Sequence, residues 1–145
     1  MDQARELLRQ TSVEVAPETF FLVSLAHDDY RRLLENPELS PGGKTPFMLL
    51  SDKYEVTMLL AQVDWQSMRH AARNARVEGN FRLVTLNLEL DWNVIGFYAL
   101  VTRILAEAEI AVGAISAYSR DHLLIKQDDL PKALKVLGEY VAELC

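Results

Sequence analysis

The sequence predicts an α+β fold made of two similar halves. Its apolar residues recur at two spacings: every second position, as in strands with one buried face, and every third or fourth position, as in helices. Read in order, each half contains a strand, a helix, two further strands and a second helix. With 145 residues, 50% of them hydrophobic, the chain can bury one substantial core or two small ones.

The first half starts with a short helix and two strands. The helix-forming residues from Asp2 to Gln10 make a segment too short to be stable unless it packs on the rest of the chain. Strands are predicted at Ser12 to Val15 and, after a proline, at the more buried Phe20 to Leu25. A helix follows from His27 to Leu34, capped by its first polar residues, and Asn36 to Pro46 is predicted to be a loop.

A hairpin and a second helix complete this half. Phe47 to Leu50 and Glu55 to Val63 are the expected strands of the hairpin, with a polar turn at Ser51-Asp52-Lys53. Asp64 is expected to cap the next helix. The apolar positions of that helix are Trp65, Met68, Ala71, Ala72 and Ala75. Val77 to Asn80, which contains a glycine, is predicted to be the turn between the halves.

The second half starts with a strand from Phe81 to Leu90, in which apolar and polar residues alternate. The next helix begins near Val94, with Asn93 or Asp91 available as its N-cap. Its apolar positions are Val94, Phe97, Tyr98, Val101, Ile104, Leu105 and Ala108. We expect the first strand to lie next to Ile110 to Tyr118 in one sheet.

The last three elements are two strands and a helix. Ile110 to Tyr118 and His122 to Ile125 are joined by the turn Ser119-Arg120-Asp121. The final helix begins at Asp128-Asp129, and Pro131 lies near its first turn, where proline loses no hydrogen bond. The inward-facing residues of this helix are expected to be Leu130, Leu134, Leu137 and Val141.

Each half is therefore one strand short of the βαββαβ unit of ferredoxin-like folds. A unit without its last strand would expose a sheet edge, so we expect the halves to share strands, with Ser12 to Val15 as the spare one. The expected product is one two-lobed domain, with residues 1–77 as the N-terminal lobe and residues 78–145 as the C-terminal lobe.

The composition argues against several classes of partner. The formal net charge is −6 and lysines and arginines form no run, which disfavours a nucleic-acid partner. No segment approaches the roughly 18 apolar residues of a membrane span, and the N-terminus does not resemble a signal peptide. The single cysteine, Cys145, cannot form an intramolecular disulfide, which fits a reducing compartment, and we expect a soluble, cytoplasmic protein.

The turn from Asp91 to Gly96 is the main candidate for a binding site. Backbone N–H groups at a helix start can hold a small anion, and Gly96 would let a ligand approach them, although it could equally serve helix–sheet packing. Asp121 could bind an ammonium or guanidinium group, or simply be a turn residue. Trp92 could line the pocket or a subunit contact.

Catalytic and metal-binding readings have little support. The adjacent residues His27-Asp28-Asp29 cannot all face one ion from a regular element. The Asp121-His122 pair is weak evidence for an enzyme, and Glu89 and Asp91 have no partner base or nucleophile. The sequence contains no glycine-rich phosphate loop and no paired cysteines. We therefore expect no enzyme activity, no metal and no cofactor.

From about Thr45 to Leu137 the chain resembles the tandem ACT-domain proteins, a family of ligand-sensing modules of amino-acid metabolism. In the first lobe the matching segment is the hairpin from Pro46-Phe47 to Val63. In the second lobe the matching segments are Val94-Ile95-Gly96, Leu105-Ala106-Glu107, Ile115-Ser116-Ala117-Tyr118 and Asp121-His122-Leu123-Leu124-Ile125. The chain is similar to small bacterial ACT proteins, to aspartokinase regulatory regions and to the cytosolic arginine sensors of animal cells. It departs from the family at Glu109-Ile110, where a glycine commonly precedes the isoleucine.

This resemblance implies two ferredoxin-like ACT lobes and a regulatory protein that binds an amino acid. It places the ligand at the turn between the first strand and helix of a lobe. The ligand-binding residues it implies are Asp91, Trp92, Asn93, Val94, Ile95, Gly96, Ile115, Ser116, Ala117, Tyr118 and Asp121. It also suggests a homodimer that pairs through the second lobe. The alternative is a ligand-independent dimerisation module that docks on a partner enzyme.

Overall fold

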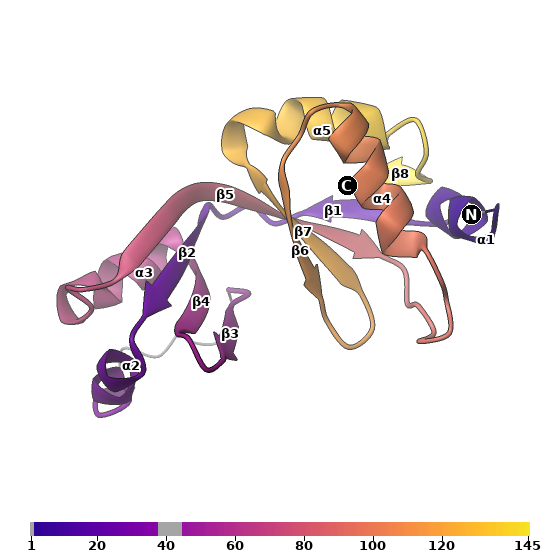
Figure 1. The fold of residues 1–145 in the computed structure, drawn as a ribbon. Coiled ribbons are helices and arrows are strands. Elements are labelled where there is room, and N and C mark those ends of the chain that lie inside the picture. Colours follow the sequence, from indigo (N-terminus) through magenta and orange to yellow (C-terminus); the bar gives the residue numbers. More distant parts are fainter. Residues whose placement is uncertain (1, 38–44) are drawn as a thin grey trace. The chain divides into compact units, whose positions relative to one another are not determined.

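The computed structural model describes residues 2–37 and 45–145 and confirms the α+β fold class (Figure 1). The chain forms two compact units, one of residues 18–80 and one of residues 1–17 with 81–145. Strand β5 (Arg76–Asn87) begins in the first of these units and ends in the second. We expected the lobes to divide between residues 77 and 78, with residues 1–17 in the N-terminal lobe. The chief difference is that residues 1–17 belong to the second unit, because their strand pairs with residues 84–87 of β5.

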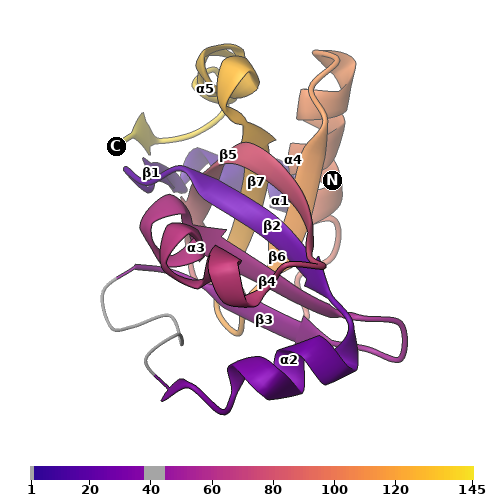
Figure 2. The ribbon, with the colours of Figure 1, turned by 90° about the vertical axis from the view of Figure 1, so that its left-hand side faces the viewer.

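The unit of residues 18–80 contains strands β2 (Phe20–Leu25), β3 (Met48–Ser51) and β4 (Val56–Ala61) and the start of β5. Its helices are α2 (His27–Leu33), α3 (Gln62–Met68) and the short 3-10 helix η2 (Arg69–Ala71). The strand order is β3-β4-β2-β5, with β4 antiparallel to both β3 and β2 (Figure 2). The order of elements, βαββαβ, is that of a complete ferredoxin-like unit.

The core of this unit lies between its sheet and its helices. Val23 and Leu25 of β2 point to the same face as Met58 and Leu60 of β4, because side chains alternate along a strand. On that face they pack against Leu33 of α2 and against residues of α3 and of the segment that follows it. The remaining buried members of this cluster are Val56, Met68 and Ala72.

Three local predictions in this unit are wrong. The N-cap of α3 is Ala61 and not Asp64, whose carboxylate instead accepts a hydrogen bond from the Thr45 hydroxyl at 2.7 Å. The N-cap of α2 is Ala26, so the polar residues from His27 onward lie inside that helix. Strand β4 also ends two residues before Val63, at the start of α3. Most of the expected loop from Asn36 to Pro46 lies outside the described residues.

The predicted turn from Val77 to Asn80 is also wrong, because these residues belong to β5. Gly79 is required there by packing: a Cβ atom at this position would lie 2.5 Å from the Phe21 ring. Asn80 keeps a positive φ of 63° within the strand. The glycine therefore marks a close approach of side chain to backbone, which a sequence pattern does not distinguish from a turn.

The unit of residues 1–17 and 81–145 has five strands in the order β6-β7-β5-β1-β8. Besides β5, they are β1 (Ser12–Val15), β6 (Val112–Ser116), β7 (Asp121–Lys126) and β8 (Glu143–Leu144). Its helices are α1 (Asp2–Arg9), α4 (Phe97–Glu107), the 3-10 helix η3 (Gln127–Asp129) and α5 (Leu130–Leu137). Contrary to expectation, β5 and β6 are not neighbours, because β7 lies between them and is antiparallel to both.

Strand β1 is the extra strand that the sequence predicted. It is antiparallel to β5 and parallel to β8, and so it lies between the first and last strands of the βαββαβ unit formed by residues 81–145. Helix α1 brings Ala4 and Leu8 into the same core as the buried faces of α4 and α5. The two ferredoxin-like lobes thus share β5, and the second lobe also incorporates the N-terminal strand.

Helix α4 ends in a hydrogen-bonding pattern that fixes the start of the next segment. The Glu109 amide donates to the Ala106 carbonyl at 2.9 Å, and the Ile110 amide donates to the Leu105 carbonyl at 3.0 Å. These are the two bonds of a Schellman motif, which requires a left-handed residue after the helix. Glu109 supplies it with a φ of 61°. This is the position where the ACT family commonly has glycine.

Candidate functional site

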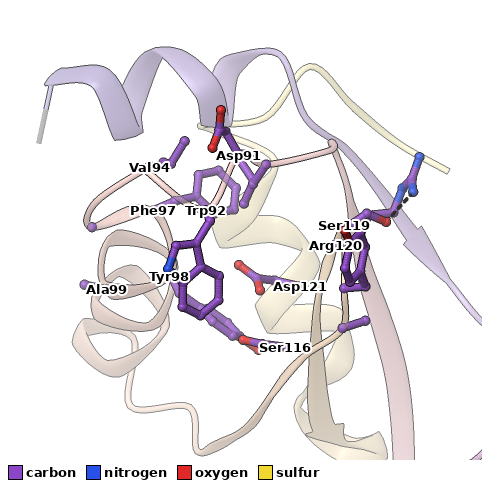
Figure 3. Close-up of a pocket in the computed structure, with 14 residues that line it drawn as sticks. Asp91, Trp92, Val94, Phe97, Tyr98, Ala99, Ser116, Ser119, Arg120 and Asp121 are labelled. Carbon is purple, nitrogen blue, oxygen red and sulfur yellow. Dashed lines mark hydrogen bonds between the residues drawn. The ribbon is translucent and has the colours of Figure 1, made fainter.

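A pocket of about 390 Å³ opens in the unit of residues 1–17 and 81–145 (Figure 3). One wall is the segment between β5 and α4 together with the first turn of α4. The other wall is the hairpin between β6 and β7. The lining residues are Leu90, Asp91, Trp92, Val94, Gly96, Phe97, Tyr98, Ala99, Ser116, Ala117, Tyr118, Ser119, Arg120 and Asp121.

Most residues of the predicted site line this pocket. Of the predicted set, Asn93, Ile95 and Ile115 are not among the lining residues. Ile95 is 84% exposed, and the Asn93 amide is bonded to the carboxylate of Asp91 at 3.1 Å. The Ile115 amide donates to the hydroxyl of Tyr98. The lining residues absent from the prediction are Leu90, Phe97, Tyr98, Ala99, Ser119 and Arg120.

Three of the missed residues, Phe97, Tyr98 and Ala99, were missed because α4 starts later than predicted. The helix begins at Phe97, three residues after Val94, and its N-cap is Gly96 with a φ of 84°. Neither Asn93 nor Asp91 caps it, because Asp91 instead closes a turn in which its carbonyl accepts the Val94 amide at 3.0 Å. A glycine followed by a long apolar helical stretch was the signal for this start.

The start of α4 is open to an anion. Gly96 provides no side-chain cap, and the first turn contains no acidic residue. The first N–H groups of an α-helix have no partner within the helix and carry partial positive charge. Gly96, Phe97, Tyr98 and Ala99 all line the pocket, so the start of this helix forms part of its wall.

The carboxylate of Asp121 points into the pocket, whereas that of Asp91 points away from it (Figure 3). Burial raises the pKa of Asp121, and the hydrogen bond from Ser116 and the nearby His122 oppose this increase. Among the described residues, no ion pair involves Asp121. The pocket therefore contains a partly desolvated carboxylate without a cationic partner.

The neighbouring Arg120 does not serve as that partner. Its Nε donates to the side-chain oxygen of Asn87 at 2.8 Å, and one terminal nitrogen donates to the Ser119 hydroxyl at 2.9 Å. The same terminal nitrogen lies 3.7 Å from the carboxylate of Glu89. The guanidinium group is thus held on the outer side of the hairpin, facing away from the pocket (Figure 3).

Asp121 and His122 do not form a catalytic pair in this geometry. They are consecutive in β7, so their side chains point to opposite faces of the sheet. The Nδ1 atom of His122 lies 2.9 Å from the hydroxyl of Thr85, its cross-strand neighbour. Burial lowers the pKa of His122; Asp121 opposes this decrease, and Arg120 adds to it. The histidine is therefore a neutral, hydrogen-bonded part of the sheet at neutral pH.

The corresponding turn in the unit of residues 18–80 is closed. Ala26 alone separates β2 from α2, where Leu88 to Gly96 separate β5 from α4. The Nε2 atom of His27 lies 2.6 Å from the Asp52 carbonyl, so the histidine bridges the helix start and the hairpin turn. Asp28 and Asp29 add negative charge to the first turn of α2. These contacts also explain His27-Asp28-Asp29 without a metal ion.

Part of the chain matches a known protein family. Residues 76–139 match the family model described as the ACT domain. No curated protein matches the chain significantly. In addition, no helix in the described parts of the chain is long and apolar enough to cross a membrane.

Several solved structures share the fold over nearly the whole chain. A protein from Agrobacterium tumefaciens has a TM-score of 0.73 and 14% identity, covering 94% of this chain and 92% of that one. A Vibrio cholerae protein of unknown function, described as a possible transport protein, has a TM-score of 0.68 and 22% identity over 96% of both chains. The regulatory subunit of aspartate kinase from Thermus flavus has a TM-score of 0.70 and 9% identity, covering 91% and 98%.

At these identities the likeness demonstrates a common fold. Every residue that lines the pocket falls within the segment that matches the ACT-domain model. The chain therefore has an α+β fold of two ferredoxin-like lobes, as in the regulatory subunit of aspartate kinase, and residues 76–139 are similar in sequence to the ACT domain.

Proposed function

We propose that this chain is a non-catalytic regulatory protein that binds a small amino acid in the pocket between α4 and the β6–β7 hairpin. The observation that carries this proposal is the pairing of two complementary groups across one pocket. An uncapped helix start forms one wall, and the unpaired carboxylate of Asp121 faces it from the other. An amino acid carries a carboxylate and an ammonium group that suit these two partners.

In the proposed binding mode, the ligand carboxylate accepts hydrogen bonds from the first amides of α4, next to Gly96. The ligand ammonium group donates to Asp121. Val94, Phe97 and Trp92 line the space available to the ligand side chain. Asp91 supports the loop rather than the ligand, since its carboxylate accepts the Asn93 amide. Asn93 and Ile95 then shape the loop without touching the ligand.

The proposal extends to assembly and regulation. Trp92 and Tyr118 lie on opposite walls of the pocket and are fully exposed, with relative accessibilities of 97% and 106%. A homodimer formed through this lobe would cover them. The likeness to a regulatory subunit of aspartate kinase supports a regulatory role. Ligand binding can control such an assembly only if the ligand binds one arrangement better than the other.

A thermal-shift screen of the twenty amino acids tests the proposal. A ligand at 100 times its dissociation constant stabilises the folded state by about 2.7 kcal/mol, so a cognate amino acid will raise the melting temperature clearly. Calorimetry should then show weaker binding of the matching amine, which lacks the carboxylate, and of the matching acid, which lacks the ammonium group. Equal binding of all three would contradict the proposed mode.

The exposed aromatic residues favour one alternative function, a ligand-independent dimerisation or docking module. In that case no amino acid would change the melting temperature. Sedimentation would give the same dimer with and without amino acids, and Trp92→Ala would dissociate it. For the proposed sensor, the cognate amino acid should instead shift the monomer–dimer equilibrium measured by sedimentation.

A further inference from the structure

The hydroxyl of Tyr98 connects the two walls of the pocket. Tyr98 is the second residue of α4, so its backbone belongs to the helix start. Its hydroxyl accepts a hydrogen bond from the Ile115 amide at 2.9 Å and donates one to the His122 carbonyl. Ile115 belongs to β6 and His122 to β7. One side chain thus joins the helix to both strands of the hairpin.

The two backbone groups that Tyr98 contacts belong to one cross-strand pair of the β6–β7 hairpin. Ile115 and His122 are cross-strand partners. Nearer the turn, the Ala117 amide donates to the Arg120 carbonyl at 3.0 Å. Hydrogen-bonded pairs alternate with non-bonded pairs along an antiparallel ladder, so Ile115 and His122 occupy the next bonding position, where the Tyr98 hydroxyl contacts the Ile115 amide and the His122 carbonyl. The Tyr98 hydroxyl is therefore hydrogen-bonded to a cross-strand pair that supports the part of the hairpin lining the pocket.

The Tyr98 hydroxyl keeps its proton at neutral pH and so remains a hydrogen-bond donor. Burial raises the pKa of Tyr98 to about 12; the Asp121 charge adds to this increase, and the bond to the Ile115 amide opposes it. Strand β6 pairs only with β7 among the described strands, and so it forms an edge of the sheet. A shift of α4 relative to the hairpin would be transmitted through Tyr98 to this edge strand.

We infer that Tyr98 is a positioning residue, whose hydroxyl sets the separation of the two pocket walls and couples ligand binding to strand β6. The ligand-binding part of this inference rests on the proposed function. The positioning of β6 does not, because the hydrogen bonds of Tyr98 are present without a ligand.

The test compares Tyr98→Phe with Tyr140→Phe, which removes a hydroxyl from another partly buried tyrosine of the same unit. Hydrogen exchange followed by NMR should show faster exchange of the Ile115 amide in Tyr98→Phe and no change in Tyr140→Phe. For the cognate amino acid, calorimetry should show affinity reduced about fivefold in Tyr98→Phe only, which corresponds to one neutral hydrogen bond.

Different results would overturn the positioning role of Tyr98 and its coupling to ligand binding. Unchanged exchange of the Ile115 amide in Tyr98→Phe overturns the positioning role, whether or not an amino acid binds. Faster exchange with unchanged ligand affinity overturns the coupling. If the wild type binds no amino acid, the proposed function fails, while the exchange result still decides the positioning role.

Should Tyr98→Phe not fold, a measurement on the wild type replaces it. Ligand binding should then slow exchange of the Ile115 amide more than that of the Gly113 amide on the same strand. Equal slowing at both positions would overturn the coupling.

Discussion

At the scale of single residues, the Asp121 carboxylate has a cost to folding that the proposed ligand would offset. A carboxylate whose pKa is raised in the folded protein binds protons more readily there than in the unfolded chain. Its ionised form therefore lowers stability at neutral pH, and the protein regains that stability as the pH falls through the raised pKa. A ligand cation would reverse this balance by favouring the ionised form.

The substitution Asp121→Asn should separate stability from binding. Without ligand, the variant should melt at the same temperature as the parent or higher at neutral pH, because the unpaired charge is gone. Its affinity for the cognate amino acid should fall by roughly 10- to 150-fold, equivalent to about 1.5–3 kcal/mol for a charge-assisted hydrogen bond. Differential scanning calorimetry and titration calorimetry measure the two effects.

Asp128→Asn provides a control for the change in net charge, since Asp128 is exposed and lies outside the pocket. In the parent protein, affinity should also decline as the pH falls through the raised pKa of Asp121. Undiminished affinity in Asp121→Asn would show that this carboxylate does not hold the ligand.

Glu109 is a second residue whose backbone conformation can be tested. A left-handed conformation costs a non-glycine residue about 1–2 kcal/mol, and glycine avoids this cost but loses more backbone entropy on folding. Glu109→Gly should therefore raise the free energy of unfolding by about 0.5–1 kcal/mol, measured by urea denaturation. Glu107→Gly, within α4, should instead lower it by about 1 kcal/mol. The same sign for both variants would refute this explanation.

At the scale of elements, the sequence predicted which helices and strands exist better than where they begin. The periodic apolar residues of α4 and the alternation in β5 identified both elements because burial on one face imposes those spacings. Helix starts were misplaced because a polar side chain can have other partners than a helix end: Asp91 accepts the Asn93 amide in a turn, and Asp64 accepts the Thr45 hydroxyl. The pocket lies at the turn that the sequence singled out, but Tyr98, which also lines it, was assigned to the core alone.

Gly79 in β5 shows why the predicted turn was wrong, and packing provides the test. Gly79→Ala places a methyl group against the Phe21 ring and should lower the free energy of unfolding by about 1–3 kcal/mol. In a Phe21→Ala background the same substitution should cost little, because the clash is gone. Equal costs in both backgrounds, measured by urea denaturation, would rule out the ring contact as the reason for glycine.

At the scale of the whole molecule, the repeated βαββαβ order did not make the two lobes equivalent. The sequence predicted the repeat and the spare strand, because elements of similar pattern recur in the same order. It did not predict where the spare strand would pair, since β1 and residues 84–87 of β5 are far apart in the chain and their register depends on long-range contacts. The lobes also differ in their helix starts, which is where the pocket lies.

This difference predicts the stoichiometry of binding. Titration calorimetry should give one amino acid per chain, because His27 bridges the matching position in the other lobe and two acidic residues follow it. His27→Ala should leave the stoichiometry at one, since Ala26 alone still separates β2 from α2 and leaves no loop to hold a ligand. Two equivalents per chain, or binding that survives Asp121→Asn and is lost in His27→Ala, would place the ligand in the other lobe.

The pairing of β1 has a consequence for synthesis of the protein. During translation, residues 1–17 emerge before any of their partners, while residues 18–80 can form their own compact unit as soon as they leave the ribosome. Residues 1–17 are therefore incorporated later than residues 18–80, although they precede them in the chain. Until residues 81–145 have followed, the strand of this segment has neither of the strands, β5 and β8, between which it lies in the folded unit.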